Sequence, residues 1–289
     1  MVAEGLVTRF HGGFCYVMVN GVVKACLPRG RLAAGGLLVG DRVKVRVARE
    51  CVVEEVLPRR TELLRPPVAN VELAVLVFSL RDPEPNFKLL DRLLVASRAA
   101  AIEAVICFNK LDLMEGAFPE ELNVYHAVGY QVLLTSALTG EGVAGLRAVL
   151  TGKISVFAGP SGSGKSSLLN AIEPSLHLKT GEISRKTRRG RHTTRLVELL
   201  PLPGGGFVAD TPGFAQLDLP DIPAARLASS FPEIAAAGVE CRFNDCLHLR
   251  EPDCAVQRAV AEGVVAPFRY RHYVNFLQEI RDRERRSWS

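Results

Sequence analysis

A glycine-rich run in the middle of the chain has the residue types and spacing of a phosphate-binding loop. The run Gly159-Pro-Ser-Gly-Ser-Gly-Lys-Ser166 fits the pattern G-x-x-x-x-G-K-S/T, between an apolar run at 154–158 and a helical segment. Glycines let backbone N–H groups curl around phosphates, where a helix N-terminus adds its positive field. We expect Lys165 to act as the catalytic cation at the outer phosphates and Ser166 to bind Mg²⁺. A chance Gly/Ser loop is the alternative, which the two flanking segments disfavour.

A second motif, Asn109-Lys-Leu-Asp112, follows another apolar run and is suited to guanine. The Asp112 carboxylate can accept from both the ring N1–H and the exocyclic amine, a donor pair that adenine lacks. We expect Asn109 to tether the base and its loop, and the Lys110 stem to lie over the ring. A site built this way rejects a base that leaves its polar groups unpaired. The motif is weak alone and strong beside a phosphate-binding loop.

Two shorter elements follow further strand-like runs. Thr135-Ser-Ala137 would bring a backbone N–H to the guanine oxygen, unless it is a plain strand-to-helix turn. Asp210-Thr-Pro-Gly213 would hold Mg²⁺ through water at Asp210 and sense the outer phosphate at the Gly213 N–H. All four elements stand where strands end, and ligands bind at the carboxyl ends of strands in open α/β sheets. The expected nucleotide contacts are Asn109, Lys110, Leu111, Asp112, Ser136, Ala137, Gly159, Pro160, Ser161, Gly162, Ser163, Gly164, Lys165, Ser166, Ser167, Asp210 and Gly213.

The order of these elements along the chain is unusual. In ordinary GTPases the phosphate-binding loop comes first, whereas here the guanine elements at 109–112 and 135–137 precede the loop at 159–166. The same sheet can be built with its chain ends relocated, so the sequence predicts a circular permutation. The loop after Asp210 then leads directly into the C-terminal segment, to which nucleotide state can be transmitted.

A cluster of soft ligands lies near the C-terminus, in the pattern Cys241-x₄-Cys246-x-His248-x₅-Cys254. Three thiols and one imidazole suit one tetrahedral Zn²⁺ with no open position, which makes the site structural. Redox or catalytic use of these cysteines is the lesser alternative, because nothing near them resembles an active site.

The elements that must position these residues fall into three parts. Five short strands, at 6–10, 14–19, 22–27, 41–48 and 51–57, predict a closed OB-type barrel, and an SH3-like barrel would give a similar pattern. Strict alternation in one strand places Arg42, Lys44 and Arg46 on one polar face, our candidate RNA-binding face. A charged, proline-bounded stretch at 58–67 reads as a linker without periodicity.

After the linker, apolar strands alternate with helices, which indicates a parallel sheet buried on both faces. The predicted strands are 71–78, 104–108, 131–134, 154–158, 196–200 and 206–209, and the helices are 87–101, 142–150 and 166–171. From residue 220 the chain turns helical, with an apolar stripe over 267–280 and a charged tail at 281–286. We therefore expect a multi-domain protein: a barrel with its linker (1–65), a permuted α/β P-loop domain (66–220) and a helical zinc-binding domain (221–289).

Composition excludes several classes of protein. A chain of 289 residues with 48% hydrophobic and 23% charged residues is neither disordered nor a coiled coil overall. Apolar runs fall far short of the ~20 residues of a membrane span, and residues 1–5 lack a basic leader. Four further cysteines (Cys15, Cys26, Cys51 and Cys107) stand singly in apolar runs, as in a reducing compartment. We expect a cytoplasmic protein with no membrane contact.

The positive charge is concentrated in two places. Residues 1–65 carry 11 basic against 6 acidic residues, and residues 185–195 carry 6 basic residues and no acidic one. Two basic blocks on a near-neutral body suggest a polyanionic partner contacted at defined places. A pair of merely solvated basic faces is the alternative.

The permuted order, the run Gly-Arg-His-Thr-Thr at 190–194, the N-terminal barrel and the C-terminal Cys/His cluster together resemble the RsgA (YjeQ) family. These are small-ribosomal-subunit-dependent GTPases, and the resemblance covers essentially the whole chain. It implies Mg²⁺-dependent hydrolysis of GTP to GDP and phosphate, stimulated by the small subunit and its rRNA late in assembly. It also implies a role in checking or releasing assembly factors. Nothing in the sequence demands an oligomer, so we expect a monomer.

By this resemblance residues 190–194 form the first switch loop, where Thr193 or Thr194 would join Ser166 and Asp210 at the Mg²⁺. The basic side chains Arg188, Arg189 and Arg191 would fold against RNA when GTP is bound, and a disordered solvated loop is the alternative.

The residue after the D-T-P-G element is Phe214, where Ras-like enzymes place the glutamine that orients water. Because phenylalanine cannot do this, we expect slow intrinsic hydrolysis. His192 is the nearby side chain able to orient or deprotonate water, unless it packs or touches rRNA.

Two other readings remain open from the sequence. A P-loop ATPase or kinase would keep the phosphate-binding loop, but Asn109 and Asp112 argue against it. A non-catalytic RNA-binding protein that merely holds GTP is compatible with Phe214.

Overall fold

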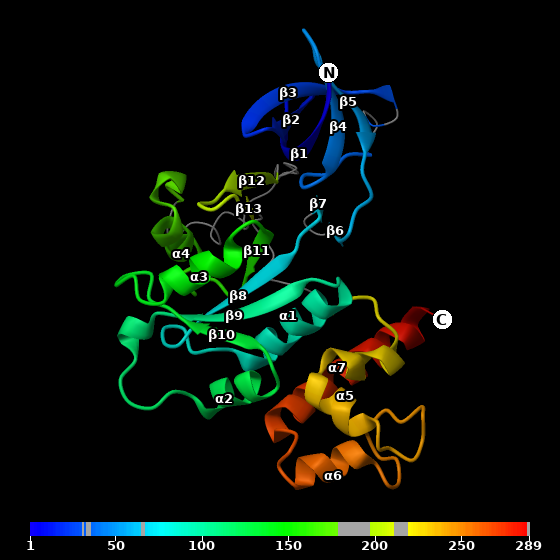
Figure 1. Ribbon diagram of the computed structural model, residues 1–289. Helices are drawn as coiled ribbons and strands as arrows, with labels where there is room; N and C mark the ends of the chain where they lie inside the picture. The colour runs from blue at the N-terminus through cyan, green and yellow to red at the C-terminus, as the bar shows by residue number, and fades with distance from the viewer. Residues whose placement is uncertain (31, 33–35, 65–66, 179–196, 211–218, 288–289) are drawn as a thin grey trace.

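The computed structural model describes the chain except for residues 31, 33–35, 65–66, 179–196, 211–218 and 288–289. Three parts follow one another along the molecule: a small barrel, a central sheet flanked by helices, and a group of C-terminal helices (Figure 1). The predicted multi-domain organisation is therefore confirmed. Among the helices in the described ranges, none has the length and apolar character that crossing a membrane requires.

Five strands form the N-terminal barrel. They are β1 (Val2–His11), β2 (Phe14–Val19), β3 (Val22–Pro28), β4 (Arg42–Val47) and β5 (Cys51–Val56). The order is β1-β2-β3-β5-β4, and β4 pairs back onto β1 to close the barrel. Strand β3 runs parallel to β5, whereas a simple meander would pair it with β4. This crossover gives the five-stranded barrel the closed, Greek-key character expected of the OB type.

The central sheet contains six strands in the order β10-β9-β8-β11-β13-β12. They are β8 (Leu73–Ser79), β9 (Glu103–Asn109), β10 (Gln131–Leu134), β11 (Ile154–Ala158), β12 (Glu198–Pro201) and β13 (Phe207–Asp210). All neighbours in this series are parallel except the antiparallel pair β12–β13. The motif-bearing ends of β9, β10, β11 and β13 consequently lie at one edge of the sheet.

Helices cover both faces of this sheet (Figure 1). They are α1 (Phe87–Ala99), α2 (Glu120–Ala127), α3 (Val143–Leu150) and α4 (Lys165–Ile172). The side chains of the fully buried strand β8 alternate between two cores, one shared with α1 and α2 (Ala74, Leu76, Phe78) and one shared with α3 and α4 (Leu73, Val75, Val77). Burial on both faces explains the continuous apolar character of this strand.

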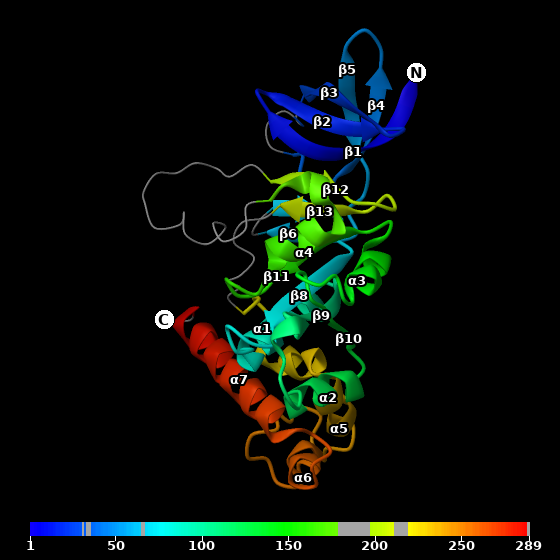
Figure 2. The ribbon, with the colours of Figure 1, turned by 90° about the vertical axis from the view of Figure 1, so that its left-hand side faces the viewer.

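The C-terminal part consists of a 3₁₀ segment (Ala224–Ser230) and the helices α5 (Pro232–Gly238), α6 (Ala255–Ala261) and α7 (Pro267–Ser287). Helix α7 extends beyond the predicted stripe at 267–280 and includes the charged tail. Within this tail, Arg283 donates to the carbonyl oxygens of Leu219 and Pro220. It is joined to α1 by the two hydrogen bonds of Arg92 to Glu279, at 2.9 and 2.7 Å. Figure 2 shows α7 running along the lower part of the molecule beside α1.

Three of the strands and helices, β6, β7 and α2, were not predicted from the sequence. The stretch predicted as an irregular linker contains β6 (Glu62–Leu64), which pairs with β7 (Pro67–Ala69) in a separate two-stranded sheet. Helix α2 was not predicted, because only Leu122 and Tyr125 along it are buried and its apolar stripe is short.

The barrel and the central sheet meet edge to edge. Strand β12 pairs with β1 at Arg9 and Glu198, so that one continuous sheet of 11 strands includes both parts. The same two side chains form an ion pair at 3.2 Å.

Candidate nucleotide site and metal centre

The phosphate-binding loop connects β11 to α4, as predicted. Two of its glycines are required by close approaches. Gly159 has φ +135°, and a Cβ there would lie 2.0 Å from the carbonyl oxygen of Val77. Gly164 has φ +90°, and a Cβ there would lie 2.2 Å from Nδ2 of Asn109. The loop therefore lies directly against the ends of β8 and β9, and no larger residue fits at these positions.

Lys165 folds back over this loop. Its Nζ donates to the carbonyl oxygens of Gly159 at 2.9 Å and Pro160 at 2.7 Å. Burial disfavours the charged form and lowers the pKa of Lys165 to about 8. Ser166, also buried, is the next residue of α4. A partly desolvated cation beside a helix N-terminus is an arrangement that binds phosphate.

Asn109 joins three segments of the site. Its Nδ2 donates to the carbonyl oxygen of Ser163 in the phosphate-binding loop at 3.0 Å. Its Oδ1 accepts from the backbone N–H of Ala137 at 3.1 Å and from the Thr135 hydroxyl at 3.4 Å. The structure therefore brings together the predicted elements at 109–112, 135–137 and 159–166. The Thr135 side chain was not among the predicted contacts, although its place at the end of β10 is a usable signal.

Other polar groups of the elements at 109–112 and 135–137 also have hydrogen-bond partners. The Ser136 hydroxyl donates to Oδ1 of Asp112 and accepts from the backbone N–H of Thr139 at 3.1 Å. Asp112 is exposed, and no hydrogen bond described in the structure reaches its second carboxylate oxygen. Lys110 has φ +63° and donates from Nζ to the carbonyl oxygen of Asp82. Leu111 starts a short 3₁₀ turn, and its backbone N–H donates to the carbonyl oxygen of Thr135 at 3.0 Å.

Other predicted residues are placed only in part. Pro160, Ser161, Gly162 and Ser167 lie in the loop and the first turn of α4. The backbone of Asp210 ends β13, which pairs with β11 and so reaches the same edge. The following predicted residues lie outside the described part of the chain: Arg188, Arg189, Arg191, His192, Thr193, Thr194, Gly213 and Phe214. Their roles stay predictions.

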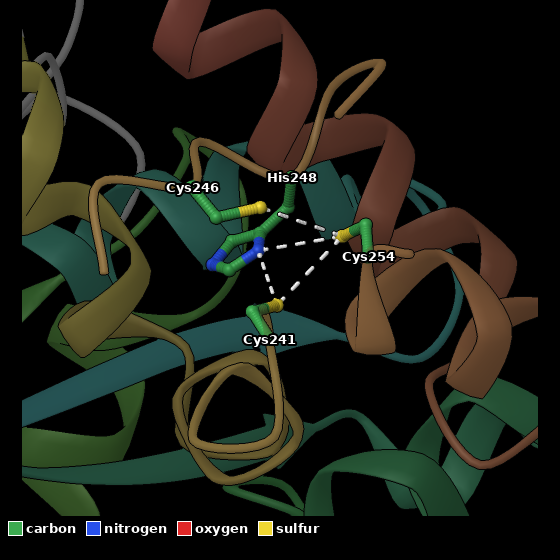
Figure 3. A group of neighbouring side chains, drawn as sticks. All are labelled: Cys241, Cys246, His248 and Cys254. Carbon is green, nitrogen blue, oxygen red and sulfur yellow. Dashed lines mark hydrogen bonds between the residues drawn. The ribbon is translucent and has the colours of Figure 1, made fainter. Parts of the chain in front are cut away.

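Cys241, Cys246, His248 and Cys254 converge into one group whose ligand atoms all lie within 4.8 Å of one another (Figure 3). Sγ of Cys254 is 3.9 Å from Sγ of Cys241 and 3.7 Å from Sγ of Cys246. Nδ1 of His248 lies 3.5 Å from Sγ of Cys241 and 3.6 Å from Sγ of Cys254. Metal–sulfur bonds of about 2.3 Å in a tetrahedron place sulfurs about 3.8 Å apart, so these four residues fit a metal ion.

The surroundings of the cluster determine its proton affinity. Burial lowers the pKa of His248, so the ring is neutral and can act as a ligand. Burial raises the pKa of the Cys246 thiol to about 12. At Cys241 burial also raises the pKa, but hydrogen bonds from the backbone N–H groups of Val256 and Ala255 and from the other two thiols outweigh it and leave the pKa lowered. A cation placed among these sulfurs would favour their thiolate forms.

The loop that carries the cluster is held from two sides. The Glu251 carboxylate accepts from the backbone N–H groups of Leu247, Leu249 and Arg250 at 3.0, 2.7 and 2.9 Å. From α7, the hydroxyl of Tyr270 donates to the carbonyl of His248 at 2.6 Å. The ring of His248 packs against Gly238 at the end of α5, where a Cβ would lie 3.3 Å from Nε2. Contacts within the loop and from α5 and α7 therefore preorganise the four ligands.

The predicted basic face of the barrel is partly neutralised. Lys44 pairs with Glu55 at 2.8 Å, and Arg46 pairs with Glu54 at 2.8 Å, both on the neighbouring strand β5. Arg42 on the same strand is exposed and has no carboxylate partner among the described residues. The sequence pattern of β4 alone could not predict these ion pairs, because they depend on the register of β4 against β5.

Fold and site together define a P-loop GTPase domain in circularly permuted order, between a barrel and a Cys₃His centre. The RsgA GTPase family profile matches residues 56–220. The chain belongs to the RsgA family and is a GTPase. It is 51% identical to the small ribosomal subunit biogenesis GTPase RsgA of Moorella thermoacetica, with 98% of this chain and 99% of that protein covered. It is 46% identical to the protein of the same name from Geobacillus thermodenitrificans, with 99% and 100% covered.

Solved structures agree with this assignment. The crystal structure of YjeQ from Thermotoga maritima superposes with a TM-score of 0.83 at 36% identity, covering 97% of this chain and 99% of that one. The structure of YloQ, described as a circularly permuted GTPase, superposes with a TM-score of 0.81 at 39% identity and covers 98% and 96%.

Proposed function

We propose that this GTPase binds the small ribosomal subunit and its rRNA and assists late maturation of the subunit. Hydrolysis is stimulated by the subunit and coupled to release, with checking or release of assembly factors as the purpose. The names of the relatives from Moorella and Geobacillus, which are similar over their full length, support the subunit as partner. The observation that supports a nucleotide site is the pair of hydrogen bonds made by the Asn109 side chain, which connect the proposed base-binding and phosphate-binding elements.

We assign the guanine base to Asp112, Lys110 and the backbone of Ala137. The second oxygen of Asp112 accepts from the base, and the Ser136 hydroxyl fixes the orientation of the carboxylate through Oδ1. The phosphates occupy the loop at 159–166, where Lys165 exchanges its two carbonyl partners for phosphate oxygens. The attraction between Lys165 and phosphate strengthens as charge develops on the transferred group.

Mg²⁺ supplies charge neutralisation between the outer phosphates when it is bound. The residues that would hold it are Ser166, at the start of α4, together with Asp210 and either Thr193 or Thr194. Ser166 fits this role because it directly follows Lys165 at the start of α4, where its side chain is buried. His192 is our candidate for orienting the attacking water, since Phe214 cannot hydrogen-bond to it.

The Cys₃His centre is proposed to hold one structural Zn²⁺. Three sulfurs and one neutral imidazole at tetrahedral separations form a donor set that zinc prefers, and no carboxylate or open position is included. Its role is to fix the loop between α5 and α6, so that the helical domain has a defined surface.

We propose that RNA is contacted at Arg42, Lys44 and Arg46 of the barrel and at Arg188, Arg189 and Arg191 of the switch loop. Because Lys44 and Arg46 already pair with glutamates, Arg42 is expected to attract phosphate more strongly than either of them. We divide the chain at 65 and 220 into barrel, GTPase and zinc-binding domains, and we expect a cytoplasmic monomer.

The test is phosphate release from GTP, with ATP in parallel, with and without purified small ribosomal subunits. We expect slow turnover of GTP alone, no turnover of ATP, and a strong increase with subunits. The Arg42→Ala variant should need a higher subunit concentration for half-maximal stimulation, with basal turnover unchanged. As a control, Arg226→Ala removes an arginine from the 3₁₀ segment of the C-terminal part. Turnover that subunits leave unaffected would remove the ribosomal role and leave the GTPase assignment in place.

A further inference from the structure

The turn between β8 and α1, residues 79–86, lies beside the nucleotide site although none of the sequence motifs includes it. It begins at Ser79, which is 1% exposed, and ends at Asn86, whose side chain caps α1 by accepting from the Leu89 N–H at 2.9 Å. Strand β8 lies between β9 and β11 in the sheet. The turn therefore leaves the sheet between the guanine motif and the phosphate-binding loop.

The shape of this turn is set by one buried hydroxyl. The Oγ of Ser79 donates to the carbonyl oxygen of Pro83 at 2.6 Å, which closes the turn. The N–H of Leu80 donates to the carbonyl oxygen of Asn109 at 2.9 Å, which ties the start of the turn to the end of β9. Without the Ser79 hydroxyl, the Pro83 carbonyl would lose the partner that holds the turn against the sheet.

The same turn contacts both halves of the nucleotide site. On the base side, Nζ of Lys110 donates to the carbonyl oxygen of Asp82. On the phosphate side, Pro83 lies next to Gly162, because a Cβ built on Gly162 would be only 3.5 Å from Cδ of Pro83. Residues 82 and 83 thus lie between Lys110 on the base side and Gly162 of the phosphate-binding loop.

We propose that Ser79 is a positioning residue for nucleotide binding, because it holds residues 82–83 as a spacer between Lys110 and Gly162. The base and phosphates of one nucleotide are joined through a ribose, so both subsites bind together only at a fixed separation. This inference rests on the proposed assignment of the nucleotide site. The spacer contacts neither Lys165 nor Ser166 through any described hydrogen bond, so it acts on affinity and not on the chemical step.

The experiment measures GDP affinity with a fluorescent GDP analogue and GTP turnover at saturating substrate, on the full chain. Ser79→Ala should weaken GDP binding about threefold to tenfold, the usual effect of losing one neutral hydrogen bond, with kcat unchanged and KM raised. Ser79→Thr keeps the hydroxyl and should restore affinity. Ser97→Ala is the matched control, because Ser97 is also buried and donates to a carbonyl, that of Leu93, within the same domain.

Two further variants keep the outcomes distinct. Pro83→Ala removes the ring atom that faces Gly162 and should also weaken GDP binding, which carries the test if Ser79→Ala does not fold. Lys165→Ala tests the proposed site itself. Loss of binding in Lys165→Ala with wild-type affinity in Ser79→Ala and Pro83→Ala would overturn the spacer alone. Unchanged GDP binding in Lys165→Ala would overturn the site assignment, and equal losses in Ser79→Ala and Ser97→Ala would overturn the positioning role.

Discussion

Asp91 of helix α1 and Arg269 of helix α7 form an ion pair in which both side chains are almost completely excluded from solvent. The two residues are separated by 178 positions in the chain and belong to the GTPase part and the C-terminal part. Arg269 also binds Glu233 of α5 through Nε at 2.7 Å and Nη2 at 3.1 Å. The second oxygen of Asp91 contacts Nδ1 of His272 at 2.6 Å. The contact between the two parts is therefore a satisfied network of charged groups.

We predict that Arg269→Met destabilises the protein strongly. It leaves Asp91 and Glu233 buried without their shared cation, and breaking a buried pair in this way costs about 3 to 5 kcal/mol. Urea unfolding followed by circular dichroism measures the loss. Arg285→Met is the control, because Arg285 pairs with Asp282 on the exposed side of the same helix and should change stability by less than about 1 kcal/mol. Equal effects of the two substitutions would contradict the role of the network.

We predict that nucleotide binding takes up a proton in mildly alkaline solution. The pKa of Lys165 is about 8 in the free protein, because burial disfavours its charge, and a bound phosphate would raise it. Above pH 8 the free protein therefore has a neutral lysine that must be protonated on binding, and GDP affinity falls as pH rises. Calorimetry at pH 8.5 in buffers of different ionisation enthalpy should detect this uptake. Heats that do not depend on the buffer would contradict it.

We predict that Asp112→Asn changes the base preference from guanine to xanthine. The asparagine carbonyl still accepts from N1–H, while its amide donates to the carbonyl that replaces the exocyclic amine in xanthine. GDP affinity should fall on the order of a thousandfold, since a group built to accept is replaced by a donor. Competition between GDP and xanthosine diphosphate measures the change. Asp221→Asn, at an exposed aspartate outside the site, should bind GDP normally.

We predict one zinc ion per chain, held by the Cys₃His centre. Cys254→Ser should lose the metal and unfold the loop between α5 and α6, while the phosphate-binding loop keeps its ability to bind GDP. Metal content by mass spectrometry and GDP binding give the two readouts. Cys51→Ser is the matched control, because Cys51 lies in the barrel far from this cluster in the chain, and it should retain the zinc. Zinc retained in Cys254→Ser would exclude that residue as a ligand.

Local motifs were the part of the site that sequence could predict. The glycine-rich loop, the guanine motif and the four metal ligands each consist of residues close together in the chain, so their spacing alone indicates their chemistry. The alternation of strands and helices likewise predicted both the barrel and the central sheet. The order of the strand ends indicated that Asn109 lies near the phosphate-binding loop. It did not indicate the hydrogen bonds of Asn109 with Ser163 and Ala137.

Features that depend on distant partners could not be predicted. Nothing in the sequence marks Asp91 as buried, because its partner Arg269 is 178 positions away. Lys44 and Arg46 read as a free basic stripe, and only the register of β4 with β5 supplies their glutamate partners. Ser79 is one small polar residue at the end of an apolar strand, where its type carries no distinctive signal.

The pairing of β1 with β12, which the described residues show at Arg9 and Glu198, has a consequence for how the protein can be divided. An outer strand of a sheet presents unpaired N–H and C=O groups, which are templates for association with other chains. Arg9 and Glu198 close that edge at one point with a backbone pairing and an ion pair. Removal of the first 57 residues would uncover β12 while leaving every GTPase motif intact. We therefore expect a truncated GTPase domain to aggregate where the full chain stays monodisperse.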